Sequence, residues 1–101
     1  MFIESISKGC FVGAGLPITQ YFDVMASRFV GAPTAALMFN GAPADAPPPE
    51  VLVVRPAPAT GYPGQLRLTI QPMTMGVGTY VVELTDANGT APGFQIFLGR
   101  L

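Results

Sequence analysis

The sequence contains no histidine and no tryptophan, and it has a single cysteine, Cys10. Histidine is the side chain that most often acts as a general acid or base near neutral pH, so most acid–base and nucleophilic mechanisms lack their usual catalyst. Cys10 has no partner for an internal disulfide and no histidine to activate it, so we expect it to be a small buried hydrophobe. These absences predict that the chain is not an enzyme and that it holds no catalytic, cofactor-binding or metal-binding residue.

Charged side chains are also scarce. They make up 11% of the residues, compared with about 25% in an ordinary soluble domain, whereas half of the residues are apolar. The five basic residues are scattered singly along the chain and the net charge is −1. Nucleic-acid binding, which depends on clustered positive charge, is therefore not expected. A surface so poor in charge predicts instead that a partner covers part of it.

Long hydrophobic runs are missing too. The apolar stretches extend over only a few residues, whereas a membrane-spanning helix needs about 20, and 11 prolines and 12 glycines interrupt the chain throughout. The first ten residues lack the basic end, apolar stretch and small-residue cleavage site of a signal peptide. We therefore expect no membrane partner and, if the chain is complete, a protein that is made in the cytoplasm.

The sequence does contain a series of short segments with the two-residue period of β-strands. The clearest are residues 65–71 and 79–85, with Asp86 to Gly89 as a following hairpin turn. Further strands are expected at 2–7, 18–25, 36–41, 50–55 and 93–99, and the residues of the two clearest strands that should face a core are Leu66, Leu68, Ile70, Tyr80, Val82 and Leu84. The proline-rich segments 41–50 and 56–64 read as loops. About seven strands in 101 residues predict one all-β domain over residues 1–101.

The stretch LTIQPMTMGVGTYVVELTDANG, residues 68–89, resembles the region around strands E and F of immunoglobulin-like domains. In that family a corner tyrosine hydrogen-bonds back to the backbone, and Tyr80 matches it. Val82 corresponds to the second disulfide cysteine of antibody domains, and Leu37 stands about where the family has its core tryptophan. The resemblance is good over residues 65–98. It implies an immunoglobulin-like sandwich of about seven antiparallel strands in two sheets, without a disulfide.

Several motifs suggest ligand sites, and we interpret each as structural. Residues 9–15 are rich in glycine, but no Gly-Lys-Ser/Thr follows, so they predict either a flexible bend or a crossing between strands and not a phosphate loop. Asp86 and Asn88 have the spacing of two calcium ligands, but the closing glutamate is missing. The six acidic residues show no clustering into a catalytic pair. Met73 and Met75 either line an adaptable contact surface or fill the end of the core.

Some apolar residues have no place in one small core once the inward side of each strand is assigned. One pair from the strand at 50–55 is among them, either Leu52 with Val54 or Val51 with Val53. Residues 1–8 form either an edge strand or an N-terminal arm. Several such residues together in a chain with few charges indicate an interface, and the residues that we predict to contact a partner are Phe2, Ile3, Val81 and Phe97.

The leading hypothesis is a structural protein of a virus particle. An immunoglobulin-like domain without a disulfide is similar to bacterial surface modules and to the accessory proteins of tailed-phage virions. Small size, low charge and surplus apolar residues favour a capsid decoration or cement protein of a bacteriophage, which binds a capsid or other virion protein in many copies or as a homo-oligomer. The alternative is a recognition module that binds a carbohydrate or cell-surface ligand through its end loops, with Tyr62 as an apolar platform. The fold alone does not decide between them.

Overall fold

The computed structural model describes residues 1–58 and 61–101. These residues form ten strands and one short 3-10 helix. The elements are β1 (Phe2–Ile6), β2 (Cys10–Val12), β3 (Gln20–Ser27), β4 (Thr34–Phe39), β5 (Ala42–Pro43), β6 (Glu50–Arg55), β7 (Gly64–Ile70), η1 (Pro72–Thr74), β8 (Gly78–Asp86), β9 (Gly89–Thr90) and β10 (Phe94–Gly99). Each of the seven segments that the sequence predicts as strands contains a strand, but β3 and β4 are offset by two residues from the predicted ranges 18–25 and 36–41. The prediction of 41–50 as a loop is wrong at Ala42–Pro43, which form β5 by pairing with β4. The three additional strands, β2, β5 and β9, have only two or three residues each.

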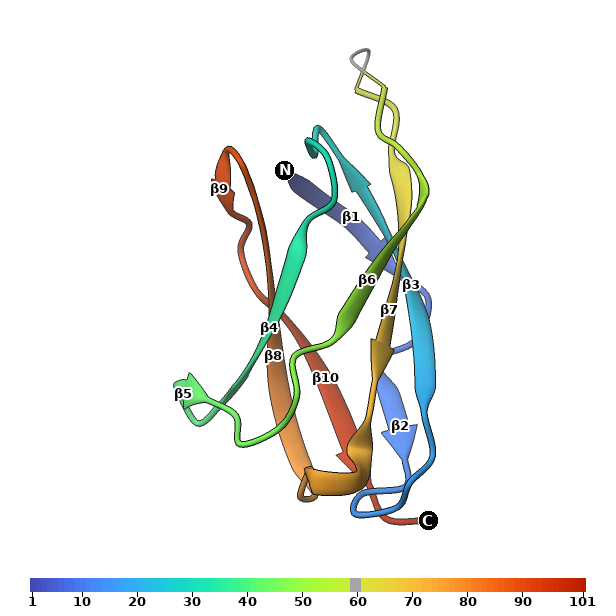
Figure 1. Cartoon of the computed structure of the whole chain (residues 1–101), viewed down its shortest axis with the longest axis vertical. Helices are drawn as coiled ribbons and strands as arrows, with labels where there is room; N and C mark the ends of the chain where they lie inside the picture. Colours follow the sequence, from blue (N-terminus) through green and yellow to red (C-terminus); the bar gives the residue numbers. More distant parts are fainter. Residues whose placement is uncertain (59–60) are drawn as a thin grey trace.

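The strands form two sheets that face each other (Figure 1). A four-stranded sheet has the order β1-β3-β7-β6, and a six-stranded sheet has the order β2-β10-β8-β4-β5 with β9 attached to β8. The chain is therefore an all-β sandwich, compatible with an immunoglobulin-like fold. At Asn40 and Gly41, which link β4 to β5, φ is +52° and +79°, the left-handed values that a two-residue hairpin turn requires.

One strand pair departs from the antiparallel arrangement that we expected, because β2 runs parallel to β10. After β1 the chain crosses to the other sheet and continues in the same direction instead of reversing through a hairpin (Figure 1). β2 therefore meets β10 with both strands running the same way. The glycine-rich segment thus includes the crossing that the sequence predicts, together with the short strand β2 and the positive-φ residues Gly13 and Gly15.

The core lies between the sheets and uses every second residue of the central strands. All six residues that the sequence assigns to the core from β7 and β8 are at most 2% exposed. Aromatic pairs fill one part of it, with ring centroids of Phe11 and Phe22 5.4 Å apart and those of Phe22 and Phe94 6.1 Å apart. Leu37 is also buried and lies opposite Val82 in the six-stranded sheet. An aliphatic pair thus stands at the two positions that the resemblance matches to the tryptophan and a cysteine of antibody domains.

The corner between β7 and β8 is fastened by Tyr80. Its hydroxyl donates a hydrogen bond to the carbonyl oxygen of Gly76 at 2.8 Å, which confirms the bond that the resemblance implies. The ring packs edge-on against Phe39, with the centroids 4.9 Å apart. Burial raises the pKa of the Tyr80 phenol above its ordinary value of 10.0, so the hydroxyl stays a neutral donor. The two corner methionines separate, since Met75 is buried in the core and Met73 is exposed.

Two predictions about which side chains are buried are settled by the structure. Cys10 is exposed, so the expectation that it is buried is wrong. Phe11 takes the inward position in β2, and the alternation of side chains then turns Cys10 outwards. In β6, Val51 and Val53 pack against the core. The surplus pair is therefore Leu52 and Val54, which are 61% and 47% exposed.

Replacing Tyr80 by phenylalanine should destabilise the fold while leaving the ring packing in place. The variant loses the bond to Gly76 but keeps the contact with Phe39, so we expect the free energy of unfolding to fall by about 1 kcal/mol. Urea denaturation of Tyr80→Phe measures this change. Tyr21→Phe, at an exposed tyrosine of β3, is the matched control. Equal effects of the two substitutions would contradict the assigned role of the corner bond.

Candidate functional site

The outer side of the six-stranded sheet carries apolar side chains on four neighbouring strands. Along β8, Tyr80 and Val82 are buried, so the residue between them, Val81, faces outwards. Val81 lies opposite Met38 of β4 on one side and opposite Gln95 of β10 on the other. We call the outward apolar residues of β2, β10, β8 and β4 the apolar face; they are Cys10, Val12, Met38, Val81 and Phe97.

The most exposed part of the apolar face lies on β2 and β10. Phe97 is 44% exposed and lies opposite Cys10, while Val12 is 49% exposed and lies opposite Gly99. A Cβ added at Gly99 would lie 3.3 Å from the Phe97 ring, so the ring lies close over the backbone there. This small residue lets Phe97 spread along its own strand towards Val12. Phe97 and Val12 together form an exposed apolar surface at the β2 edge of the six-stranded sheet.

Val81 is less accessible than Phe97. A Cβ at Gly93 would collide with Cγ1 of Val81, which shows that the backbone at Gly93 packs directly on this side chain. Val81 is therefore half-buried although it lies on the outer side of the sheet. Val81 therefore adds little accessible area to the apolar face, and most of that area comes from Phe97 and Val12.

Charge distinguishes the outer sides of the two sheets. Within the described strands of the six-stranded sheet, Glu83 is the one outward residue with a charged side chain. The four-stranded sheet instead has an ion pair between Arg67 Nε and Asp23 Oδ1 at 3.0 Å, and the Arg67 guanidinium lies 4.4 Å from the centroid of the Tyr21 ring. The hydrogen bond from Arg67 to Asp23 raises the pKa of Arg67. The apolar face is thus the sheet surface with the least compensating charge.

The structure does not bring the four predicted contact residues together. Val81 and Phe97 both lie on the apolar face. Phe2 lies in β1 at the edge of the other sheet, opposite Ser27, and is 61% exposed. Ile3 is partly buried against the core. Residues Phe2–Ile6 form the edge strand β1, one of the two alternatives for the N-terminal segment.

Sequence reasoning missed Cys10, Val12 and Met38 as members of the apolar face. The three residues of β2 are all apolar, so periodicity could not tell which of them faces the core. Met38 follows the buried Leu37 in β4, and the alternation there would have assigned it outwards. Its closeness to Val81, however, depends on the pairing of β4 with β8, which a local pattern does not contain.

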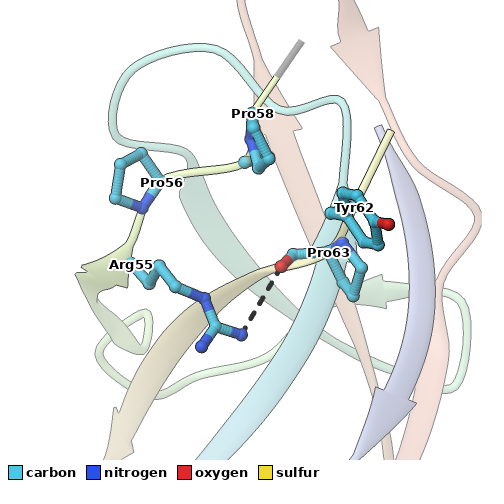
Figure 2. Close-up of a pocket in the computed structure, with 6 residues that line it drawn as sticks. Arg55, Pro56, Pro58, Tyr62 and Pro63 are labelled. Atoms are coloured by element: carbon cyan, nitrogen blue, oxygen red, sulfur yellow. Dashed lines mark hydrogen bonds between the residues drawn. The ribbon is translucent and has the colours of Figure 1, made fainter. Parts of the chain in front are cut away.

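A second surface feature lies where β6 ends and β7 begins. A hollow of about 460 Å³ is lined by Arg55, Pro56, Ala57, Pro58, Tyr62 and Pro63 (Figure 2). Tyr62 is 73% exposed, and a guanidinium nitrogen of Arg55 donates to the Pro63 carbonyl at 3.5 Å. Residues 59 and 60 of the predicted loop at 56–64 lie outside the described residues. The side chains that line the hollow are mostly apolar, with the Arg55 guanidinium and the Tyr62 hydroxyl as polar groups.

The turn at Asp86 uses its carboxylate for internal hydrogen bonds. One oxygen accepts the backbone N–H of Asn88 at 2.9 Å, and the other accepts that of Val30 at 3.0 Å. Burial opposes ionisation of Asp86, but these N–H groups outweigh it and lower its pKa below the ordinary value of 3.8. Oδ1 thus closes the β8–β9 turn on itself, and Oδ2 ties the turn to the loop after β3, in agreement with a structural interpretation of the turn.

The described part of the chain holds neither a metal cluster nor a membrane-spanning helix. In residues 1–58 and 61–101 there is no group of three or more histidine, cysteine, aspartate or glutamate side chains placed to hold a metal ion. The helical structure found in the same residues is too short to cross a membrane. Every buried side-chain nitrogen or oxygen described has a hydrogen-bond partner, so no orphaned polar group marks a binding cavity.

Comparison with protein-family models and with curated proteins found no match to the chain. The class of protein therefore rests on the fold itself, an all-β sandwich of two sheets.

Replacing Asp86 by alanine should reduce stability in a pH-dependent way. Because the pKa of Asp86 is lower in the folded chain than the unfolded value of 3.8, its contribution is fully present above pH 3.8 and is lost as the pH falls through the folded pKa. We expect the urea midpoint of Asp86→Ala to lie below that of the wild type at pH 7, and the difference to narrow at about pH 2.5. Asp45→Ala, in an exposed loop, is the control. A difference that is constant with pH would contradict this account.

Proposed function

We propose that the protein is a non-enzymatic structural protein that binds a larger protein assembly through the apolar face of its six-stranded sheet. The observation that carries this proposal is the exposure of Phe97 and Val12, at 44% and 49%, on a sheet side with Glu83 as its one charged outward strand residue. Removing apolar surface from water contributes about 25 cal/mol for each Å². A partner therefore gains by covering this face and has few charges to desolvate.

The assembly that we propose is a virus particle, with this chain as a small capsid decoration or cement protein of a bacteriophage. The resemblance of residues 68–89 to disulfide-free immunoglobulin-like domains, the length of 101 residues and the charged fraction of 11% support this choice. The partner would be a capsid or other virion protein, bound by many copies of the chain. A protein that binds only the assembled shell stabilises it by mass action.

A second candidate function is recognition of a carbohydrate or cell-surface ligand through the end loops. The exposed Tyr62 ring lines a hollow together with prolines 56, 58 and 63 (Figure 2), and this favours recognition because an aromatic ring offers a flat apolar platform. Sugar sites also require several convergent polar groups, and the two polar side chains at this hollow are few for that purpose. We therefore rank this function second.

Binding to a shell should depend on Phe97 but not on Phe2. We expect the wild-type chain to bind a phage shell stripped of its decoration protein and to raise the shell's disassembly temperature, and Phe97→Thr to weaken binding at least about tenfold, as for a residue in the centre of an interface. Phe2→Thr is the matched control, since it removes an even more exposed ring, 61% against 44%, from the other sheet. Deletion of residues 1–8 is less informative, because it also removes Ile3 and Ile6 from their contacts with the core.

The proposal fails if the wild-type chain leaves the disassembly temperature of every candidate shell unchanged. Equal binding by Phe97→Thr and the wild type would instead show that the shell does not contact the apolar face. Urea denaturation of both variants establishes that each remains folded.

Ligand recognition by the end loops is tested by a glycan array with the wild-type chain and Tyr62→Ala. If the second candidate function holds, the wild type binds a defined set of glycans and the variant loses that binding, because the aromatic platform is gone. An array without signal for the wild type counts against this function and leaves the first one untouched.

A further inference from the structure

The strand β6 lies at the edge of the four-stranded sheet and pairs only with β7 within the described residues. On its other side, alternate backbone N–H and C=O groups point away from the sheet, as they do along any edge strand. The backbone hydrogen bonds that the described loops make include none to Glu50–Arg55. Among the described residues this edge therefore has no backbone hydrogen-bond partner, although β6 also approaches β4 of the other sheet.

The side chains of β6 make that edge unusually apolar. The strand reads EVLVVR, with four consecutive aliphatic residues and no proline or glycine. Leu52 and Val54 are exposed on the outer side, while Val51 and Val53 are only partly covered by the core on the inner side. Edge strands are usually protected from pairing by charges or proline within the strand. Here such residues stand only at the ends and beyond them.

The flanks restrict any pairing to this one strand. Prolines at 47, 48 and 49 precede β6, and Pro56 follows it. Proline has no backbone N–H to donate to a ladder, so a pairing strand cannot extend far past either end. The flanks therefore favour a short, closed contact over an open fibre.

The register with β7 shows how the side chains of β6 are arranged. Val53 lies opposite Leu66 and Arg55 lies opposite Gln65, so Val54 is the extra residue of a bulge. Glu50, Leu52 and Arg55 consequently occupy the first, third and fifth ladder positions on the outer side. Val51 and Val53 occupy the second and fourth positions on the inner side.

This arrangement is complementary to itself. When two copies of β6 lie antiparallel about a two-fold axis at Leu52, Glu50 of each copy lies opposite Arg55 of the other. Leu52 then lies opposite Leu52, and Val51 lies opposite Val53. Opposite charges and aliphatic pairs at facing positions both stabilise a strand pair, and this register places no like charges opposite each other.

We propose that β6 pairs antiparallel with β6 of a second copy of this chain, which joins the two four-stranded sheets into one continuous sheet across the dimer. The contact is isologous, as a two-fold dimer requires. It does not depend on the proposed function, because it uses the edge of one sheet whereas the apolar face belongs to the other. Six residues on each side form an interface well below the standard size of about 1,600 Å², so the dimer is expected to be weak.

A charge swap tests the proposed register. Sedimentation equilibrium of the wild-type chain from micromolar to millimolar concentration should show a monomer–dimer equilibrium. Glu50→Arg and Arg55→Glu, each alone, should raise the dimer dissociation constant about tenfold, because each replaces two attractive cross-strand pairs by repulsive ones. The double variant Glu50→Arg/Arg55→Glu restores both pairs and should return the constant to within about threefold of the wild type. Asp45→Arg, which makes the same charge change in a loop, should leave it unchanged.

A cross-link tests the position of the two-fold axis. Facing Cα atoms in an antiparallel pair are about 4.5–5.5 Å apart, which is within the reach of a disulfide. In a Cys10→Ser background, which removes the exposed native thiol, Leu52→Cys should form a covalent dimer on mild oxidation. Tyr21→Cys in the same background places an exposed thiol on β3 and should remain monomeric.

The proposal is overturned if the wild-type chain is monomeric at millimolar concentration, or if the double swap fails to restore the dimer that each single change weakens. A dimer that is broken by Phe97→Thr and is indifferent to the charge changes would also overturn it, because that dimer would form through the apolar face. Urea midpoints of the variants, expected to equal that of the wild type, separate loss of pairing from loss of folding. A failure of shell binding, by contrast, bears on the proposed function alone.

Discussion

The structure depends on the alternation of side chains between the two sides of a β-strand. In β7 and β8 this alternation places Leu66, Leu68, Val82 and Leu84 between the sheets, where each is at most 1% exposed. The same rule leaves the intervening residues on the outside, whatever their chemistry. A strand that is apolar at successive positions, as β2 and β6 are, must therefore display some of its apolar residues. The core and the candidate interfaces thus have the same origin.

Local sequence patterns were sufficient for the longer strands and insufficient for the short strands and for the pairing partners. The seven longer strands follow from periodicity, and the bond of Tyr80 to the backbone follows from the resemblance to immunoglobulin-like domains, whereas its acceptor, Gly76, is known only from the structure. β2, β5 and β9 were missed because two or three residues contain no period. The parallel pairing of β2 with β10 was not foreseen, since it depends on where the chain crosses between sheets. Burial of Phe11, and with it the exposure of Cys10, is a consequence of that crossing.

The candidate site was predictable to a similar extent. Val81 and Phe97 were identified as surplus residues from the alternation of their own strands, but their neighbours on the apolar face come from other strands. Met38 joins Val81 through the β4–β8 register, and Cys10 joins Phe97 through the β2–β10 register. Phe2 and Ile3 were grouped with them because sequence position does not reveal which sheet a strand joins. A surface patch on a sandwich is a property of cross-strand register, which a single sequence does not specify.

The two proposed contacts differ in the physics that would hold them, and their positions on different sheets make them compatible. Covering the apolar face removes hydrophobic surface from water, whereas pairing at β6 completes backbone hydrogen bonds and brings Glu50 opposite Arg55. Neither contact is large, and a single small contact gives weak binding. On an assembled surface, however, one contact raises the effective concentration for the other, so two weak contacts together hold a subunit far more firmly than either alone. A chain with few charges and two such surfaces is suited to bind where its neighbours are already arranged, and to remain dissociated where they are not.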